Sequence, residues 1–200
     1  MICVFCGSAS GRAPTYAAAA RELGELLAKR GIGLVYGGGN VGLMGELADA
    51  VLDAGGRAIG VIPQQLVDRE IAHGGLTELH VVENLHQRKA LMAELADAFL
   101  TLPGGVGTME ELFEVWSWGR LGLHSKPCGL LNVDGYFDSL RTLTDQMVTE
   151  GFLEPEYWEM LLIEKQPNVL LDRLATYVPP GRWNRAELLA TDDGGVGSSA

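Results

Sequence analysis

The sequence predicts an α/β fold in which a doubly wound parallel sheet carries helices on both faces. Short apolar runs alternate with helical segments along the chain, and strands of this kind are typical of a parallel sheet that is covered on both sides. Glycine-rich turns at Gly7, at residues 37–39 and at residues 104–107 each follow a predicted strand and precede a predicted helix. These turns therefore meet at one edge of the sheet, where folds of this Rossmann-like type bind their ligands.

The first half of the chain alternates clearly between strands and helices. Strands are predicted as short apolar runs over residues 2–6, 33–36, 57–62 and 79–82. Helices are predicted over residues 14–30, over residues 41–53, and after Asn84. Pro14 suits the first turn of a helix, and Asn84 suits the N-cap position.

The second half continues the alternation to about residue 178. Further strands are predicted over residues 98–102, 128–133 and 161–164, and helices over 108–121, 139–150 and 169–177. We therefore expect a single Rossmann-like domain over residues 1–178. The remaining tail, residues 179–200, ends in glycine, serine and alanine, and its end is expected to be disordered.

Composition and charge exclude several classes of protein. The formal net charge of −11 argues against a nucleic-acid-binding protein, which needs a basic surface. Charges or glycines interrupt every apolar stretch before it reaches the roughly 18 residues of a membrane helix. The first residues form a predicted strand and lack the basic start of a signal peptide, so the expected location is cytoplasmic.

Cysteine and histidine spacing does not predict a metal site. Cys3 and Cys6 form a C-x-x-C motif, but along a strand this spacing places the two thiols on opposite faces, about 10 Å apart. No second C-x-x-C completes a zinc site, and the four histidines lack metal-ligand spacing. Both cysteines are therefore expected to pack inside the protein.

The turn over residues 103–111, Pro-Gly-Gly-Val-Gly-Thr-Met-Glu-Glu, is the strongest functional signal. If the helix begins at Thr108, its unpaired N–H groups favour an anion such as a phosphate. The same sequence offers a second interpretation, because Thr108 and Glu111 match a capping box. Three glycines in four positions are more than a cap requires, and this favours the phosphate.

Gly37-Gly38-Gly39-Asn40-Val41-Gly42 matches the G-x-G-x-x-G pattern and raises a dehydrogenase alternative. The motif, however, follows the second predicted strand, and the next strand ends without an acid that could bind a ribose diol. We interpret this turn as a second wall of the same pocket. Arg88 and Lys89 stand together nearby in sequence, whereas Trp116 and Trp118 are expected to pack in the core.

An ordered set of motifs runs from residue 2 to about residue 177. Its members are Cys6-Gly7-Ser8, Tyr36-Gly37-Gly38-Gly39, Gly42-Leu43-Met44-Gly45, Gly60-Val61-Ile62-Pro63, Arg69-Glu70, His86-Gln87-Arg88-Lys89, residues 103–111 and residues 129–136. This set closely resembles the Lonely guy family of cytokinin-activating phosphoribohydrolases, whose signature is P-G-G-x-G-T-x-x-E. Members have often been labelled lysine decarboxylases. That label lacks support here, because Lys89 is the only lysine near a motif and looks placed for an anion rather than for a Schiff base.

The resemblance implies a function and a set of site residues. The implied reaction cleaves the N-glycosidic bond of cytokinin riboside 5′-monophosphates, and of AMP, to give the free base and ribose 5-phosphate. Arg88 and Glu111 are implied to be catalytic. The expected nucleotide contacts are Ser8, Gly39, Glu70, Arg88, Lys89, Gly105, Val106, Gly107, Thr108, Met109, Glu110, Glu111 and Ser117. A homodimer is also implied, and we expect neither a metal ion nor an organic cofactor.

The implied chemistry agrees with the residue types. Cleavage of a ribosyl C1′–N bond develops oxocarbenium character on the sugar, which a carboxylate at Glu111 could stabilise while it activates water. Arg88 could hold that carboxylate in place or contact the substrate. The alternative from another class is a non-catalytic nucleotide or cofactor carrier on the same fold. A carrier would need the glycine turns but not both Arg88 and Glu111.

Overall fold

The computed structural model describes residues 1–67 and 72–180. Within these ranges it contains a single sheet whose strands lie in the order β4-β3-β2-β1-β5-β6-β7. The strands are β1 (Ile2–Phe5), β2 (Leu34–Tyr36), β3 (Ala58–Pro63), β4 (Glu78–Val82), β5 (Ala98–Thr101), β6 (Cys128–Leu131) and β7 (Leu161–Glu164). All neighbouring strands are parallel. The predicted fold class is confirmed.

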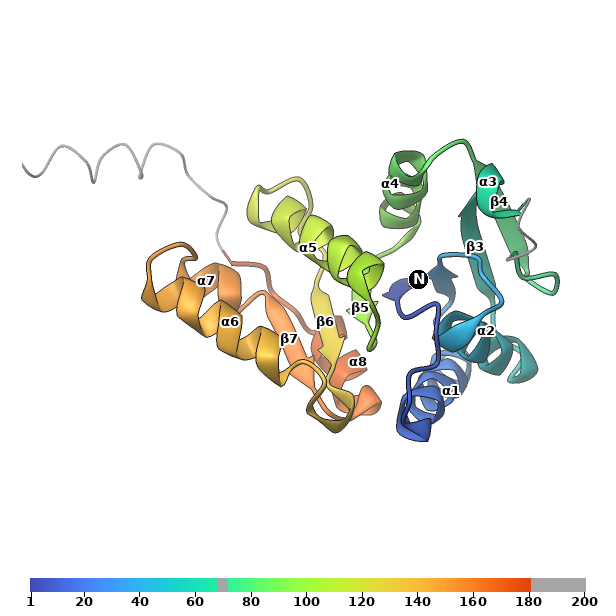
Figure 1. The fold of residues 1–200 in the computed structure, drawn as a ribbon, viewed down its shortest axis with the longest axis horizontal. Helices are drawn as coiled ribbons and strands as arrows, with labels where there is room; N and C mark the ends of the chain where they lie inside the picture. Colours follow the sequence, from blue (N-terminus) through green and yellow to red (C-terminus); the bar gives the residue numbers. More distant parts are fainter. Residues whose placement is uncertain (68–71, 181–200) are drawn as a thin grey trace, which may run out of the picture.

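Helices cover both faces of the sheet (Figure 1). One face packs against α1 (Pro14–Lys29), α2 (Gly42–Asp53) and α8 (Pro167–Ala175). The other face packs against α4 (Leu85–Leu95), α5 (Val106–Arg120), α6 (Asp138–Thr149) and α7 (Pro155–Trp158). A short helix, α3 (Gln64–Val67), follows β3, and a 3₁₀ turn (Val133–Gly135) follows β6. None of the helices in the described residues is long and apolar enough to span a membrane.

Cys3 in β1 and Cys6 directly after it show how the sheet separates two cores. Cys3 packs in the core beneath α4 and α5, and Cys6 packs in the core beneath α1 and α2. Both thiols are free and buried, and burial raises the pKa of each above its usual value. The expectation that the two residues pack on opposite faces is therefore confirmed.

The strand order reverses between β1 and β5, and this switch point lies beside the glycine turns. Backbone bonds join these turns directly. Gly7 N–H donates to Pro103 O at 3.1 Å, and Leu43 N–H donates to Gly7 O at 3.0 Å. The turns after β1 and β5 and the start of α2 thus form one connected surface at the carboxyl edge of the sheet.

Most helix and strand ends lie within two residues of their predicted positions, and the Asn84 cap is confirmed by its bond to Gln87 N–H at 3.0 Å. The sequence analysis missed α3 and α7 because each has only four residues, too few to show a helical period. Arg69, Glu70 and the part of the predicted tail beyond Pro180 lie outside the described residues.

Candidate active site

A cavity of about 380 Å³ opens at the carboxyl edge of the sheet, beside the switch point. It is bounded by the turns after β1, β2 and β5, by Arg88 of α4, by the first two turns of α5 and by apolar side chains from α2, β3 and α3. The predicted site residues that line it are Ser8, Gly39, Arg88, Gly105, Val106, Gly107, Thr108 and Glu111. The fold therefore brings together residues that are widely separated in the sequence.

The start of α5 differs from the prediction. The helix begins at Val106 rather than Thr108, and Gly105 is its N-cap without a side-chain bond. The capping-box interpretation of Thr108 and Glu111 is therefore wrong. The N–H groups of Val106, Gly107 and Thr108 lie in the first turn, where a helix offers them no partner, and this turn borders the cavity.

The compact turn before α5 depends on glycine at position 104. A Cβ atom on Gly104 would lie 2.1 Å from the Thr108 hydroxyl oxygen, so a larger residue would displace the buried Thr108 side chain. The Tyr136 hydroxyl donates a hydrogen bond to Gly104 O. These contacts fix the direction of the N–H groups at the start of α5.

Arg88 and Glu111 form an ion pair inside the cavity. Arg88 Nη2 lies 3.2 Å from Glu111 Oε1, and the two side chains are only 14% and 11% exposed. Burial raises the pKa of Glu111 above its ordinary value, although the neighbouring Arg88 charge opposes this shift. Arg88 Nε is buried and has no hydrogen-bond partner among the described residues. The pair thus presents a carboxylate whose pKa has moved toward neutral pH and a guanidinium with a free donor.

The second glycine turn makes room for this arginine. A Cβ atom on Gly37 would lie 2.1 Å from Arg88 Nη2, so the guanidinium packs directly on the glycine. The turn itself is held by the buried Tyr36, whose hydroxyl donates to Gly39 O at 3.1 Å. This geometry agrees with the interpretation of residues 37–42 as a pocket wall.

Some expected contacts lie outside the cavity. Lys89, Met109, Glu110 and Ser117 do not line it, and Lys89 Nζ instead binds the carboxylates of Glu110 and Glu114. Ser117 is exposed on α5. Trp116 is buried and its indole N–H donates to Tyr157 O at 2.9 Å, which confirms its place in the core.

An apolar wall of the cavity was not found in the sequence analysis. It consists of Val41, Met44, Ile62 and Leu66. Ile62 lies near the end of β3, and Leu66 lies in the short α3 that follows it. Val41 is the N-cap of α2, and Met44 lies in its first turn. Their positions after the carboxyl ends of β2 and β3 are the signal that could have revealed them.

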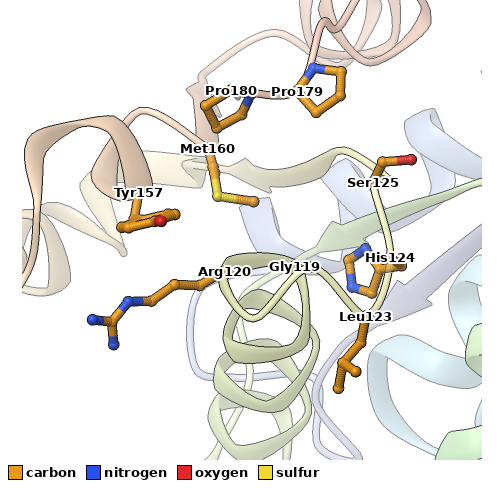
Figure 2. A pocket seen from close by; sticks show the side chains of 10 residues that line it. Gly119, Arg120, Leu123, His124, Ser125, Tyr157, Met160, Pro179 and Pro180 are labelled. Atoms are coloured by element: carbon orange, nitrogen blue, oxygen red, sulfur yellow. The ribbon is translucent and has the colours of Figure 1, made fainter. Parts of the chain in front are cut away.

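A second hollow of about 230 Å³ lies at the far end of α5 (Figure 2). Arg120 lies over the Tyr157 ring at 5.3 Å and also pairs with Glu154. His124 accepts a bond from Lys126 N–H and its other ring nitrogen contacts Val115 O at 2.8 Å. Since none of the predicted site residues lines this hollow, the candidate active site is the cavity at the glycine turns.

Comparisons with solved structures support the fold. The chain has a TM-score of 0.66 and 22% identity to the molybdenum cofactor binding protein from the phototrophic bacterium Rippkaea orientalis, covering 88% of this chain and 95% of that one. A structure of the Moco carrier protein from Chlamydomonas reinhardtii gives a TM-score of 0.66 at 20% identity, covering 88% and 98%. At these identities the likeness shows a shared fold.

Sequence comparisons show the family. A family model described as "Possible lysine decarboxylase" matches residues 44–174. The chain is 51% identical over 177 residues to the probable cytokinin riboside 5′-monophosphate phosphoribohydrolase LOGL3 of Oryza sativa subsp. japonica, covering 88% of this chain and 84% of the relative. It is also 51% identical over 178 residues to the cytokinin riboside 5′-monophosphate phosphoribohydrolase LOG7 of Arabidopsis thaliana, covering 89% and 82%. The chain therefore belongs to the family of the cytokinin riboside 5′-monophosphate phosphoribohydrolases, which the family model describes as possible lysine decarboxylases.

Proposed function

We propose that this protein hydrolyses the N-glycosidic bond of cytokinin riboside 5′-monophosphates, which are N6-substituted forms of AMP, and of AMP itself. Water is consumed, and the products are the free base and ribose 5-phosphate. The observation that carries the proposal is the Arg88–Glu111 pair, which lies in one cavity with the glycine turn at the start of α5. The names of the relatives with 51% identity support the same reaction.

Glu111 is assigned the central chemical role. As the C1′–N bond breaks, positive charge develops on the ribose ring, and a carboxylate beside C1′ stabilises it. The same carboxylate accepts a proton from the attacking water. A raised pKa suits this task, because a base is most effective when its pKa lies near the working pH. Arg88 keeps Glu111 ionised and oriented.

The 5′-phosphate is assigned to the first turn of α5. The N–H groups of Val106, Gly107 and Thr108 border the cavity, and the positive end of the helix dipole favours an anion there. Such a contact would supply binding energy away from the reacting bond and would position the ribose over Glu111.

The phosphate assignment predicts a strong preference for nucleotides over nucleosides. We expect AMP, or an N6-substituted analogue, to be cleaved far faster than the matching nucleoside at equal concentration. Removal of the phosphate discards charge-assisted bonds to backbone N–H groups, at about 1.5–3 kcal/mol each. The measurement is chromatography of the released base, with AMP and adenosine in parallel. Equal rates on the two substrates would contradict the assignment and would point to a nucleoside hydrolase.

Likeness to the Moco carrier proteins does not favour a carrier function, because at 20–22% identity it shows the fold alone. The Arg88–Glu111 pair favours an enzyme, since a carrier has no need for a buried carboxylate with a raised pKa in the binding cavity. If the protein binds AMP tightly but releases no base from AMP or from its N6-substituted analogues, the carrier function would be favoured instead.

We also propose that the protein forms a symmetric dimer through part of α5. Leu112, Val115 and Trp116 are buried within the chain, whereas Phe113 and Trp118 are only half-buried. The helix thus carries more apolar surface than its own chain covers. We expect light scattering at micromolar concentration to give twice the chain mass of 21.4 kDa. A mass equal to that of one chain would end the proposal.

A further inference from the structure

Tyr136 reaches the glycine turn before α5 from the neighbouring strand of the sheet. It follows the 3₁₀ turn after β6, and β6 pairs with β5, so the chain that leaves β6 lies beside the turn that leaves β5. The Tyr136 hydroxyl donates to Gly104 O in that turn. A side chain from outside the turn therefore holds the carbonyl group of Gly104.

The chain around Tyr136 is held firmly in place. The next residue, Phe137, is 1% exposed and packs in the core beneath α5. Buried Asn132 accepts a bond from Phe137 N–H at 2.8 Å and donates one to Asp138 Oδ1 at 2.8 Å. The rings of Tyr16 and Tyr136 pack in a T-shaped arrangement, with their centroids 5.8 Å apart. These contacts give the Tyr136 hydroxyl a defined position.

The peptide that Tyr136 holds joins two glycines, and it has two orientations available. Rotation of its plane by about half a turn changes only ψ of Gly104 and φ of Gly105. The φ angle of Gly105 is −91°, so the rotated peptide would give it a positive φ, which glycine tolerates. In the present orientation a Cβ atom on Gly105 would meet no atom within 4 Å, so packing does not require glycine there. Glycine at position 105 thus leaves the rotated orientation open.

The two orientations differ in the direction of the Gly105 N–H group. This peptide is trans, so the Gly104 carbonyl and the Gly105 N–H point in opposite directions. Gly105 borders both the active-site cavity and a hollow of about 280 Å³ beside it, whereas Tyr136 lines the hollow alone. With its carbonyl held on the Tyr136 side, the peptide directs Gly105 N–H toward the cavity. Within residues 1–67 and 72–180 this N–H has no acceptor.

We propose that Tyr136 is a positioning residue, which selects this orientation and so supplies Gly105 N–H as a further donor to the substrate phosphate. The inference rests on the proposed function, in which the phosphate lies at the first turn of α5. Without the hydroxyl, the peptide would also populate the rotated orientation. The Gly104 carbonyl oxygen would then face the cavity and would repel the anion.

Tyr136→Phe is the first test, because it removes the hydroxyl and keeps the ring that packs on Tyr16. We expect KM for AMP to rise about threefold to tenfold, at most the value of one charge-assisted bond. The contact exists before and during the reaction, so kcat should change little. Kinetics on adenosine should stay as in the parent. The preference for AMP over adenosine should therefore fall by the same factor as KM rises.

Tyr16→Phe is the matched control, since it makes the same change in the adjacent ring. The Tyr16 hydroxyl forms no hydrogen bond with the described part of the chain, so both KM and kcat should equal those of the parent. A Tyr136→Phe variant with an unchanged KM for AMP overturns the proposal. So does a loss of kcat that is equal on AMP and adenosine with KM in place, because that pattern indicates a purely structural role.

A double variant tests the rotation of the peptide itself. Alanine at position 105 disfavours a positive φ and so disfavours the rotated orientation. We therefore expect Tyr136→Phe to raise KM by less than about twofold when it is added to Gly105→Ala, with Gly105→Ala alone as the reference. An equal rise in KM in both backgrounds would show that the hydroxyl does not act through this peptide, and would overturn the proposal.

Calorimetric binding of ribose 5-phosphate gives the same comparison without turnover. Its dissociation constant should rise in Tyr136→Phe by the factor expected for AMP, whereas binding of adenosine, which lacks the phosphate, should not change. If the parent hydrolyses no nucleotide but ribose 5-phosphate binding weakens in this way, the proposed function fails and the role of Tyr136 stands. Equal binding of ribose 5-phosphate by parent and variant, in a protein that is active on AMP, overturns the role of Tyr136 alone.

Discussion

Glu111→Gln is expected to lower turnover of AMP and its N6-substituted analogues by roughly a hundredfold or more. Glutamine fills the same space beside Arg88, but it neither stabilises an oxocarbenium ion nor accepts a proton from water. Because α5 begins at Val106, the residue takes no part in a helix cap. Stability should therefore change by less than about 1 kcal/mol. Released base and the thermal melting temperature are the two measurements.

Glu154→Gln is the matched control for this variant. Glu154 pairs with Arg120 at 3.1 Å at the other end of α5, away from the cavity, and its loss should leave turnover unchanged. If Glu111→Gln keeps most of its activity, the catalytic carboxylate has to be sought at Glu110 or Glu70.

Gly37→Ala is expected to lower turnover by about tenfold to a hundredfold while the protein still folds. The added Cβ would lie 2.1 Å from Arg88 Nη2, so the guanidinium has to leave its place beside Glu111. Displacements of about 1 Å in a catalytic arrangement cost rates of this size. Gly37 does not have a positive φ, and the atom it meets is the end of a flexible side chain, so folding should tolerate the change.

The measurement compares turnover with the melting temperature for Gly37→Ala and for Gly74→Ala. Gly74 also lacks a positive φ, and a Cβ there would meet no atom within 4 Å, so its substitution should leave both quantities unchanged. Normal turnover in Gly37→Ala would show that the position of Arg88 has no influence on the reaction.

Much of the fold could be predicted because most of the strands are short apolar runs, and those of β2 and β3 stop at Gly37 and Pro63. The strand predicted over residues 161–164 agrees with β7 at both ends. The predicted start of α5, Thr108, was wrong for a physical reason. Thr108 and Glu111 have the spacing of a capping box, but Glu111 turns to Arg88 of α4, and Gly105 takes the cap position. A tertiary contact thus overrode a local pattern.

The candidate site could be predicted in part. Each glycine turn follows a predicted strand and precedes a predicted helix, so the sequence could predict that the turns lie together at one edge of the parallel sheet. The partners of Lys89 could not be foreseen, because they belong to another helix and depend on how α4 packs against α5. The position of Lys89 near a motif suggested an anion site, whereas in the fold its partners are the carboxylates of Glu110 and Glu114.

Main-chain bonds between the turns have a consequence for how this site can evolve. The turns beside the cavity are tied together through Gly7, Pro103 and Leu43 by backbone groups, which every residue except proline carries in full. By contrast, the rim includes Val106, whose side chain is 88% exposed and contacts little of the protein. Mutations on the rim can therefore accumulate without disturbing these backbone bonds. Proteins with this fold can therefore come to accept different bases while the contacts proposed for the ribose 5′-phosphate stay the same.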